Sequence, residues 1–199
     1  MPHIDYYLST ISPNVYNAGT RLEEIADRHG ATITYKPVDI GGIFGQTGGT
    51  PLPQRHENRK VYRLQELERG AKLAGHPINT QPAFFPANGA PSAYAIIAAQ
   101  EAGGGNLGQL CHDLAKACWA EEKDVSDDAV IGAALEANGF SSSLTMSGML
   151  TGAETFTRNT EEAIKAGVFG VPFYITDTDE RFWGQDRLEM LDMHLSGKL

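Results

Sequence analysis

Ser12 and Pro13 mark a helix start that could also hold an anion. Serine is favoured as an N-cap and proline as the first helical residue, so the pair predicts a helix beginning here. The same geometry directs the Ser12 hydroxyl and unpaired backbone N–H groups at a bound group, and a thiolate placed there is stabilised. Ser12 is therefore a candidate catalytic residue acting on the sulfur of a bound cosubstrate, although a helix start by itself needs no ligand.

Val171 and Pro172 form a second candidate site. They follow the small-residue turn at 167–170 and open an aromatic and β-branched segment. A proline that opens a strand is often cis, and the residue before it is extended. The N–H and C=O groups of Val171 could then pair with a peptide-like ligand as an added strand. The alternative is a trans proline on an edge strand, which requires no ligand.

Gln185 and Asp186 precede the last predicted helix and form a third candidate site. Glu189 follows Asp186 at the spacing of a capping box, which is a purely structural arrangement. The functional alternative has Asp186 holding an ammonium group and Gln185 bonding a nearby carboxylate. Gly184 would let such a ligand approach the backbone closely.

The elements that must position these residues follow from periodicity, caps and turn residues. The pattern predicts strands over 4–8, 31–38, 171–176 and 181–183. It predicts helices over 14–29, 58–73, 92–101, 107–120, 126–137, 148–166 and 186–195. The glycine-rich stretch 41–49 and the proline-bracketed stretch 81–91 are expected to be loops. The βαβ opening implies a parallel strand pair with a right-handed crossover.

This order of elements predicts a split α/β domain, βαβ…ββα, with an all-helical insertion. We expect residues 1–40 and 161–199 to form the α/β domain and residues 41–160 the insertion. The formal net charge of -9 disfavours nucleic acid and anionic lipid as partners. The scattered histidines have no metal-ligand spacing, so no metal is expected.

The two cysteines also bear on the compartment. Cys111 and Cys118 lie seven residues apart on one predicted helix, too far apart for a disulfide, and are expected to be small buried hydrophobes. No basic stretch followed by an apolar run opens the chain, and no segment is long enough to span a membrane. These features favour a protein of the reducing cytoplasm.

Together, the motifs resemble the glutathione-using branch of the thioredoxin superfamily. Ser12-Pro13 after an aromatic strand, the stretch 167–172 and the stretch 182–188 resemble the 2-hydroxychromene-2-carboxylate isomerases, with the kappa-class glutathione transferases next. The resemblance spans the whole chain and implies a thioredoxin-like fold with a helical insertion. Disulfide oxidoreductases of this superfamily have Cys-Pro-x-Cys where residues 12–15 read Ser-Pro-Asn-Val, so dithiol exchange is excluded there.

The resemblance implies glutathione as the cofactor and assigns roles to single residues. Ser12 would stabilise the glutathione thiolate, Val171 before Pro172 would pair with its cysteinyl backbone, and Gln185 with Asp186 would hold its γ-glutamyl end. The family also has an asparagine and a lysine ahead of the first helix of the insertion. The lysine corresponds to Arg59 or Lys60, whereas the asparagine position falls on Gly49.

The implied reaction is the cis–trans isomerisation of an aromatic pyruvate by reversible thiolate addition, with glutathione regenerated. We expect a cytoplasmic homodimer that acts on a small aromatic carboxylate in aromatic compound degradation. The substrate would contact Phe44, Phe84, Phe85 and Asn88. One alternative is a kappa-class-like glutathione transferase or peroxidase, and another is a redox-inactive binding domain.

Overall fold

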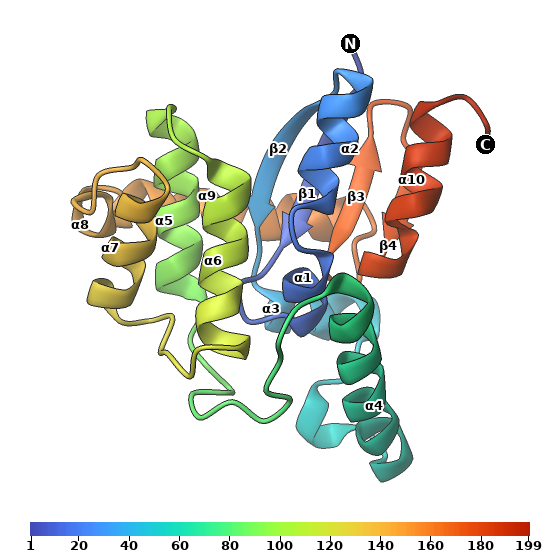
Figure 1. Ribbon diagram of the computed structural model, residues 1–199, viewed down its shortest axis with the longest axis horizontal. Helices are drawn as coiled ribbons and strands as arrows, with labels where there is room; N and C mark the ends of the chain where they lie inside the picture. The colour runs from blue at the N-terminus through green and yellow to red at the C-terminus, as the bar shows by residue number, and fades with distance from the viewer.

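A four-stranded mixed sheet lies at the centre of the molecule (Figure 1). The structure is a computed structural model that describes all 199 residues. The strand order is β2-β1-β3-β4, with β1 parallel to β2 and antiparallel to β3, and β3 antiparallel to β4. The strands are β1 His3–Leu8, β2 Thr32–Pro37, β3 Phe173–Thr176 and β4 Arg181–Trp183. All four correspond to predicted strands.

Ten helices surround the sheet, and those between β2 and β3 form the helical insertion. In Figure 1, α2 and α10 lie in front of the sheet, α9 crosses behind it, and α5 to α8 lie beside the β2 edge. The α-helices are α1 Pro13–Ala18, α2 Arg21–His29, α3 Ile40–Thr47, α4 Glu57–Ala74, α5 Ala90–Ala102, α6 Leu107–Trp119, α7 Asp128–Ala137, α8 Leu144–Ser147, α9 Met149–Lys165 and α10 Leu188–Leu195. Two 3₁₀ turns cover Leu52–Gln54 and Gln185–Arg187. The predicted fold class, βαβ…ββα with a helical insertion, is confirmed. None of the helices is both long and apolar enough to cross a membrane.

The single helix predicted over 14–29 is in fact two helices. The chain leaves helical geometry at Gly19, whose φ is 61°, and α2 starts afresh at Arg21. The Gly19 N–H donates to the Tyr16 carbonyl at 3.1 Å, which closes the last turn of α1. Glycine adopts a positive φ at little cost, so the break falls there although the apolar spacing continues through it.

The loop predicted over 41–49 is wrong in its first part, because residues 40–47 form α3. Asp39 caps this helix, and its Oδ1 accepts a hydrogen bond from the Gly41 N–H at 2.9 Å. Ile43 is fully buried and α3 packs against α9. Tertiary packing therefore overrides the low helix propensity of three glycines in eight residues.

Smaller differences concern boundaries and one missed element. β3 begins at Phe173 rather than at 171, and the helix predicted over 186–195 begins with a 3₁₀ turn. The short helix α8 was not predicted, because its single turn is too short to show a periodic pattern.

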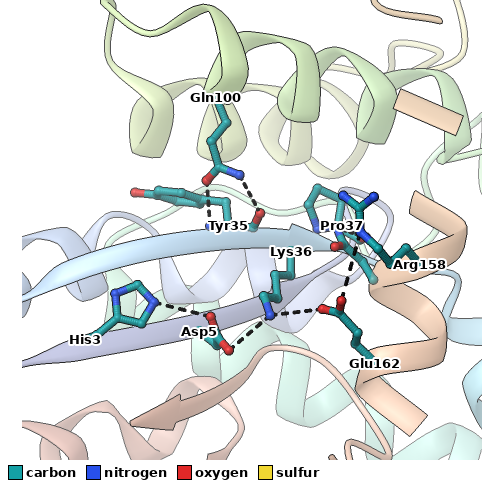
Figure 2. A network of polar contacts seen from close by, with 9 residues as sticks. His3, Asp5, Tyr35, Lys36, Pro37, Gln100, Arg158 and Glu162 are labelled. Carbon is teal, nitrogen blue, oxygen red and sulfur yellow. Dashed lines mark hydrogen bonds and ion pairs between the residues drawn. The ribbon is translucent and has the colours of Figure 1, made fainter. Parts of the chain in front are cut away.

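Side chains from α5 and α9 attach the insertion to the β2 edge of the sheet (Figure 2). The Gln100 carboxamide pairs with the Tyr35 backbone as a strand would: the Tyr35 N–H donates to its Oε1 at 2.8 Å, and its Nε2 donates to the Tyr35 carbonyl at 3.1 Å. Lys36 Nζ lies 3.1 Å from Asp5 on β1 and 3.2 Å from Glu162 on α9. The two Gln100 bonds pair backbone groups of an edge strand that would otherwise be free, and the Lys36 ion pairs link that strand to β1 and α9.

A carboxylate lies largely buried between α2 and the sheet. The Tyr35 hydroxyl donates to Glu23 Oε1 at 2.7 Å, while Oε2 is buried without a partner. Burial raises the pKa of the Glu23 carboxyl above its ordinary value of 4.5, and the hydrogen bond from Tyr35 offsets part of this rise. A carboxyl with a raised pKa takes up a proton on folding, so stability is lost as the pH rises through the folded-state pKa.

We therefore expect Glu23→Gln to gain stability relative to the wild type as the pH is raised from about 5 to about 8, because the amide never ionises. The expected gain is on the order of 1 kcal/mol, or a few degrees in Tm. Denaturant unfolding at both pH values measures it. Glu24→Gln removes an equal charge from an exposed position in the same turn and is the control. Parallel pH profiles for the two variants would contradict the prediction.

Candidate functional site

Ser12 and Val171 meet in space although 159 residues separate them in the chain. Ser12 is the N-cap of α1, and its Oγ accepts a hydrogen bond from the Val15 N–H at 3.4 Å. The same hydroxyl donates to the Val171 carbonyl at 3.3 Å, and the Val171–Pro172 peptide is cis. Two of the residues that the sequence singles out therefore lie in direct contact.

The sheet topology brings these residues together. β1 ends at Leu8, and the antiparallel β3 begins at Phe173, so the segments that carry Ser12 and Val171 lie at the same end of the two central strands. The Ser12 N–H donates to the Ser9 carbonyl at 3.0 Å, which holds the short connection between β1 and α1. The position of Ser12 is thus fixed by backbone bonds on its own side and by Val171 on the other.

Two backbone donors next to Ser12 have no acceptor. The Asn14 N–H, in the first turn of α1, and the Val171 N–H donate to no group of the chain. Asn14 is exposed, whereas Val171 is 7% exposed. Free backbone donors on both sides of a hydroxyl are suited to binding an anion or a peptide group.

A cavity of about 420 Å³ opens in front of Ser12. Aromatic walls come from Phe44 on α3, Phe85 in the α4–α5 connection and Trp183 at the end of β4. Its size and its largely apolar lining are typical of small-molecule sites. Phe84 and Asn88 are not among the lining residues. The Phe84 ring is 46% exposed, and Asn88 Oδ1 accepts a hydrogen bond from the Ala90 N–H at 3.1 Å at the start of α5.

Two arginines, Arg55 and Arg63, also line this cavity, and neither forms an ion pair. The Arg55 guanidinium lies 5.9 Å from the Phe44 ring centroid, and that of Arg63 lies 5.9 Å from the Phe85 centroid and 5.8 Å from the Trp119 centroid. Burial lowers the pKa of both groups, and the charge of Arg55 lowers that of Arg63 further. Two half-buried cations without counter-ions create a strong local preference for an anion.

Arg59 and Lys60, which the resemblance offers as cofactor ligands, do not line the cavity. The Arg59 side chain is exposed, and Lys60 Nζ lies 3.7 Å from a Glu57 carboxylate oxygen in the first turn of α4. Arg63 lies one helical turn further along the same face of α4 as Arg59, and of the two only Arg63 lines the cavity.

Gln185 and Asp186 lie beyond the cavity and connect to it through the backbone. Gly184 has a φ of 109° and donates its N–H to the Pro172 carbonyl at 2.9 Å. Only glycine adopts this backbone conformation readily, so the turn depends on it. The Gln185 side-chain oxygen accepts a hydrogen bond from Arg21 at 2.6 Å, and Asp186 pairs with Arg187 at 2.9 Å.

Comparison with known proteins decides the family. The family model described as DSBA-like thioredoxin domain matches residues 3–196. The chain belongs to this family. It is 28% identical over 192 residues to a 2-hydroxychromene-2-carboxylate isomerase of Pseudomonas putida, covering 95% of this chain and 92% of the relative. Glutathione S-transferase kappa 1 of Caenorhabditis elegans is 22% identical over 205 residues, covering 96% and 89%. A solved 2-hydroxychromene-2-carboxylate isomerase superposes with a TM-score of 0.76 at 25% identity, covering 98% of this chain and 95% of that structure.

This DSBA-like thioredoxin domain is thus a distant homologue of the isomerases that its motifs resemble. It keeps no thiol at the helix start, where Ser12 and Val15 stand. Cys111 and Cys118 are both buried, as predicted. Burial raises the pKa of both thiols, that of Cys118 to about 11, so neither is a ready nucleophile.

Sequence reasoning missed three of the residues that line the cavity of this DSBA-like thioredoxin domain. They are Arg55, Arg63 and Trp183. Trp183 was included in a motif but given no role of its own. The basic residues did carry a signal, because four of them cluster within residues 55–63 of a strongly acidic chain.

Proposed function

We propose that this protein is a glutathione-dependent cis–trans isomerase of aromatic pyruvates, similar to 2-hydroxychromene-2-carboxylate isomerase. The observation that carries the proposal is the contact between Ser12 Oγ and the Val171 carbonyl at the head of a cavity that also contains two unpaired arginines. The homologues named for this activity support it, since they cover almost the whole chain.

The residues around Ser12 fit glutathione. The Val171 N–H, which has no acceptor, would donate to the cysteinyl carbonyl, and the Val171 carbonyl would accept the cysteinyl N–H as in an added strand. The Gln185 amide and the Asp186 carboxylate would hold the carboxylate and the ammonium group of the γ-glutamyl end. When bound, glutathione supplies a thiolate that adds to the conjugated carbon of the substrate and leaves again.

Ser12 would stabilise the negative charge on that sulfur. Its hydroxyl now donates to Val171 at 3.3 Å, which is long for a hydrogen bond between oxygens, so turning it towards a sulfur anion costs little. A hydrogen bond to a charged acceptor is about twice as strong as a neutral one. The Asn14 N–H lies in the same turn and adds a second donor.

The rest of the cavity would bind the substrate. Phe44, Phe85 and Trp183 provide apolar faces for an aromatic ring. Arg55 and Arg63 would hold the pyruvate carboxylate, since guanidinium groups bind carboxylates in two-pronged geometry. An uncharged aromatic compound would gain only the apolar contacts.

The proposed function is tested with purified protein, 2-hydroxychromene-2-carboxylate and glutathione. We expect the ratio of the ring-opened cis and trans forms to reach equilibrium quickly only when glutathione is present, while titration of total free thiol shows no loss. Thiol loss in proportion to product would instead show a transferase, the function suggested by the kappa-class relative. If the reaction does not depend on glutathione and the protein does not bind glutathione at millimolar levels, both enzyme functions are overturned and a binding domain is favoured.

A further inference from the structure

Arg21, the first residue of α2, is a cation without an acidic partner. It is half-buried, and it takes part in none of the ion pairs of the structure. Its Nε donates to the Ala18 carbonyl at 3.1 Å, and its Nη2 lies 3.0 Å from the Asn17 carbonyl. The guanidinium therefore caps the last carbonyls of α1, the helix that Ser12 begins.

The same Nη2 reaches a segment 164 residues further along the chain. It lies 3.2 Å from the Gln185 backbone carbonyl and 2.6 Å from the Gln185 side-chain oxygen Oε1. Arginine only donates hydrogen bonds, so it fixes which end of the carboxamide faces it. The Gln185 Nε2 must point the other way, towards Gly70 on α4, where a Cβ atom would lie only 3.6 Å from it.

Hydrogen bonds, together with the peptide bonds between neighbouring residues, form a closed path that connects Arg21 to the cavity. Ser12 at the start of α1 bonds to Val171, and the Pro172 carbonyl accepts the Gly184 N–H at 2.9 Å. Gln185 follows directly and is held by Arg21, which bonds back to the end of α1. Both ends of one helix are thus linked to the two segments proposed to bind glutathione.

We infer that Arg21 is a positioning residue for glutathione, which rests on the proposed function above. By holding Oε1, it presents the two free N–H groups of Gln185 to the α-carboxylate of the γ-glutamyl end, at a fixed distance from Ser12. Arg21 itself donates only to protein oxygens. Its loss affects how tightly glutathione binds and leaves the chemistry at the sulfur unchanged.

The test is the binding of glutathione, by titration calorimetry, to variants of the full chain. Arg21→Lys keeps the charge but lacks the two-armed donor needed to cap α1 and hold Gln185 together. We expect its Kd for glutathione to rise about tenfold, with kcat at saturating glutathione unchanged within about twofold. Arg28→Lys is the matched control on the same helix, because Arg28 is 57% exposed and pairs only with Asp192.

A second variant keeps the inference falsifiable should Arg21→Lys fold poorly. Gln185→Glu retains an acceptor for Arg21 but offers no N–H group, so its Kd should rise at least as much. The double variant Arg21→Lys, Gln185→Glu should bind no more weakly than the worse single variant, since both changes remove one interaction. Additive losses, or wild-type affinity in both single variants, would overturn the role of Arg21. A wild-type protein that binds no glutathione would overturn the proposed function instead.

Discussion

Ser12→Ala is expected to lower the turnover of the proposed isomerisation roughly 10²–10³-fold while the fold of the protein stays intact. The hydroxyl is the side-chain donor at the position proposed for the sulfur anion, and removing one donor of this kind costs about that much in other enzymes. The expected loss of folding stability is small. The cap bond from the Val15 N–H is 3.4 Å long, so we expect a stability loss of about 1 kcal/mol or less.

The pH dependence separates a role at the sulfur from a role in folding. Without the Ser12 hydroxyl, the thiol of bound glutathione should ionise nearer to the ordinary cysteine value of about 8.5. The rate of the variant should therefore rise with pH over a range where the wild-type rate is already level. Steady-state rates from pH 6 to pH 9 measure this shift.

Asp127→Ala provides the matched control for Ser12→Ala. Asp127 caps α7, away from the cavity, and its Oδ1 accepts a hydrogen bond from the Ala129 N–H at 2.8 Å. This variant should lose as much stability as Ser12→Ala or more, and keep its turnover. If Ser12→Ala turns over as fast as the wild type, or if the two variants lose activity equally, Ser12 has no part in the chemistry.

The strands and the general order of the fold could be predicted because their signals are local. Alternating or β-branched runs mark strands such as 31–38, and the βαβ order limits the topology. The helix α3 could not be predicted, since nothing in a run with three glycines tells that Ile43 will be buried against α9. The break at Gly19 was equally hidden, because the apolar spacing on either side continues without a shift.

The arrangement of the candidate site was predictable where a residue's position along the chain fixes its place in space. Ser12 and Val171 lie just beyond the ends of two adjacent strands, and the Ser12 Oγ lies 3.3 Å from the Val171 carbonyl oxygen. The identity of the cationic side chains was not predictable, because Arg59 and Arg63 share one face of α4, and which of them lines the cavity depends on how far along α4 the cavity lies and on the path of the chain before it. Phe84 and Phe85 differ for the same reason: neighbours in an irregular segment point in different directions, and only Phe85 lines the cavity.

Replacing both cavity arginines is the second change with a large expected effect. Each charge-assisted hydrogen bond contributes about 1.5–3 kcal/mol, so Arg55→Gln and Arg63→Gln should each raise the KM for a carboxylate substrate at least about tenfold. The double variant should raise it roughly a hundredfold or more. The KM for an uncharged ester of the same substrate should change little in these variants. This result would separate lost charge recognition from a distorted cavity. Arg69→Gln, further along α4, is the matched control, because the Arg69 side chain is 58% exposed and pairs with Glu66.

The stability of the arginine variants gives an independent check on this interpretation. Burial lowers the pKa of both guanidinium groups, and the charge of a neighbouring arginine lowers each further, so the charged forms that persist at neutral pH oppose folding. Removing them should therefore leave Tm unchanged or raise it, although binding is lost. Such a combination is typical of residues kept for function at a cost in stability. Variants that lose Tm together with substrate affinity would show instead that Arg55 and Arg63 hold the cavity walls in place through their contacts with Phe44, Phe85 and Trp119.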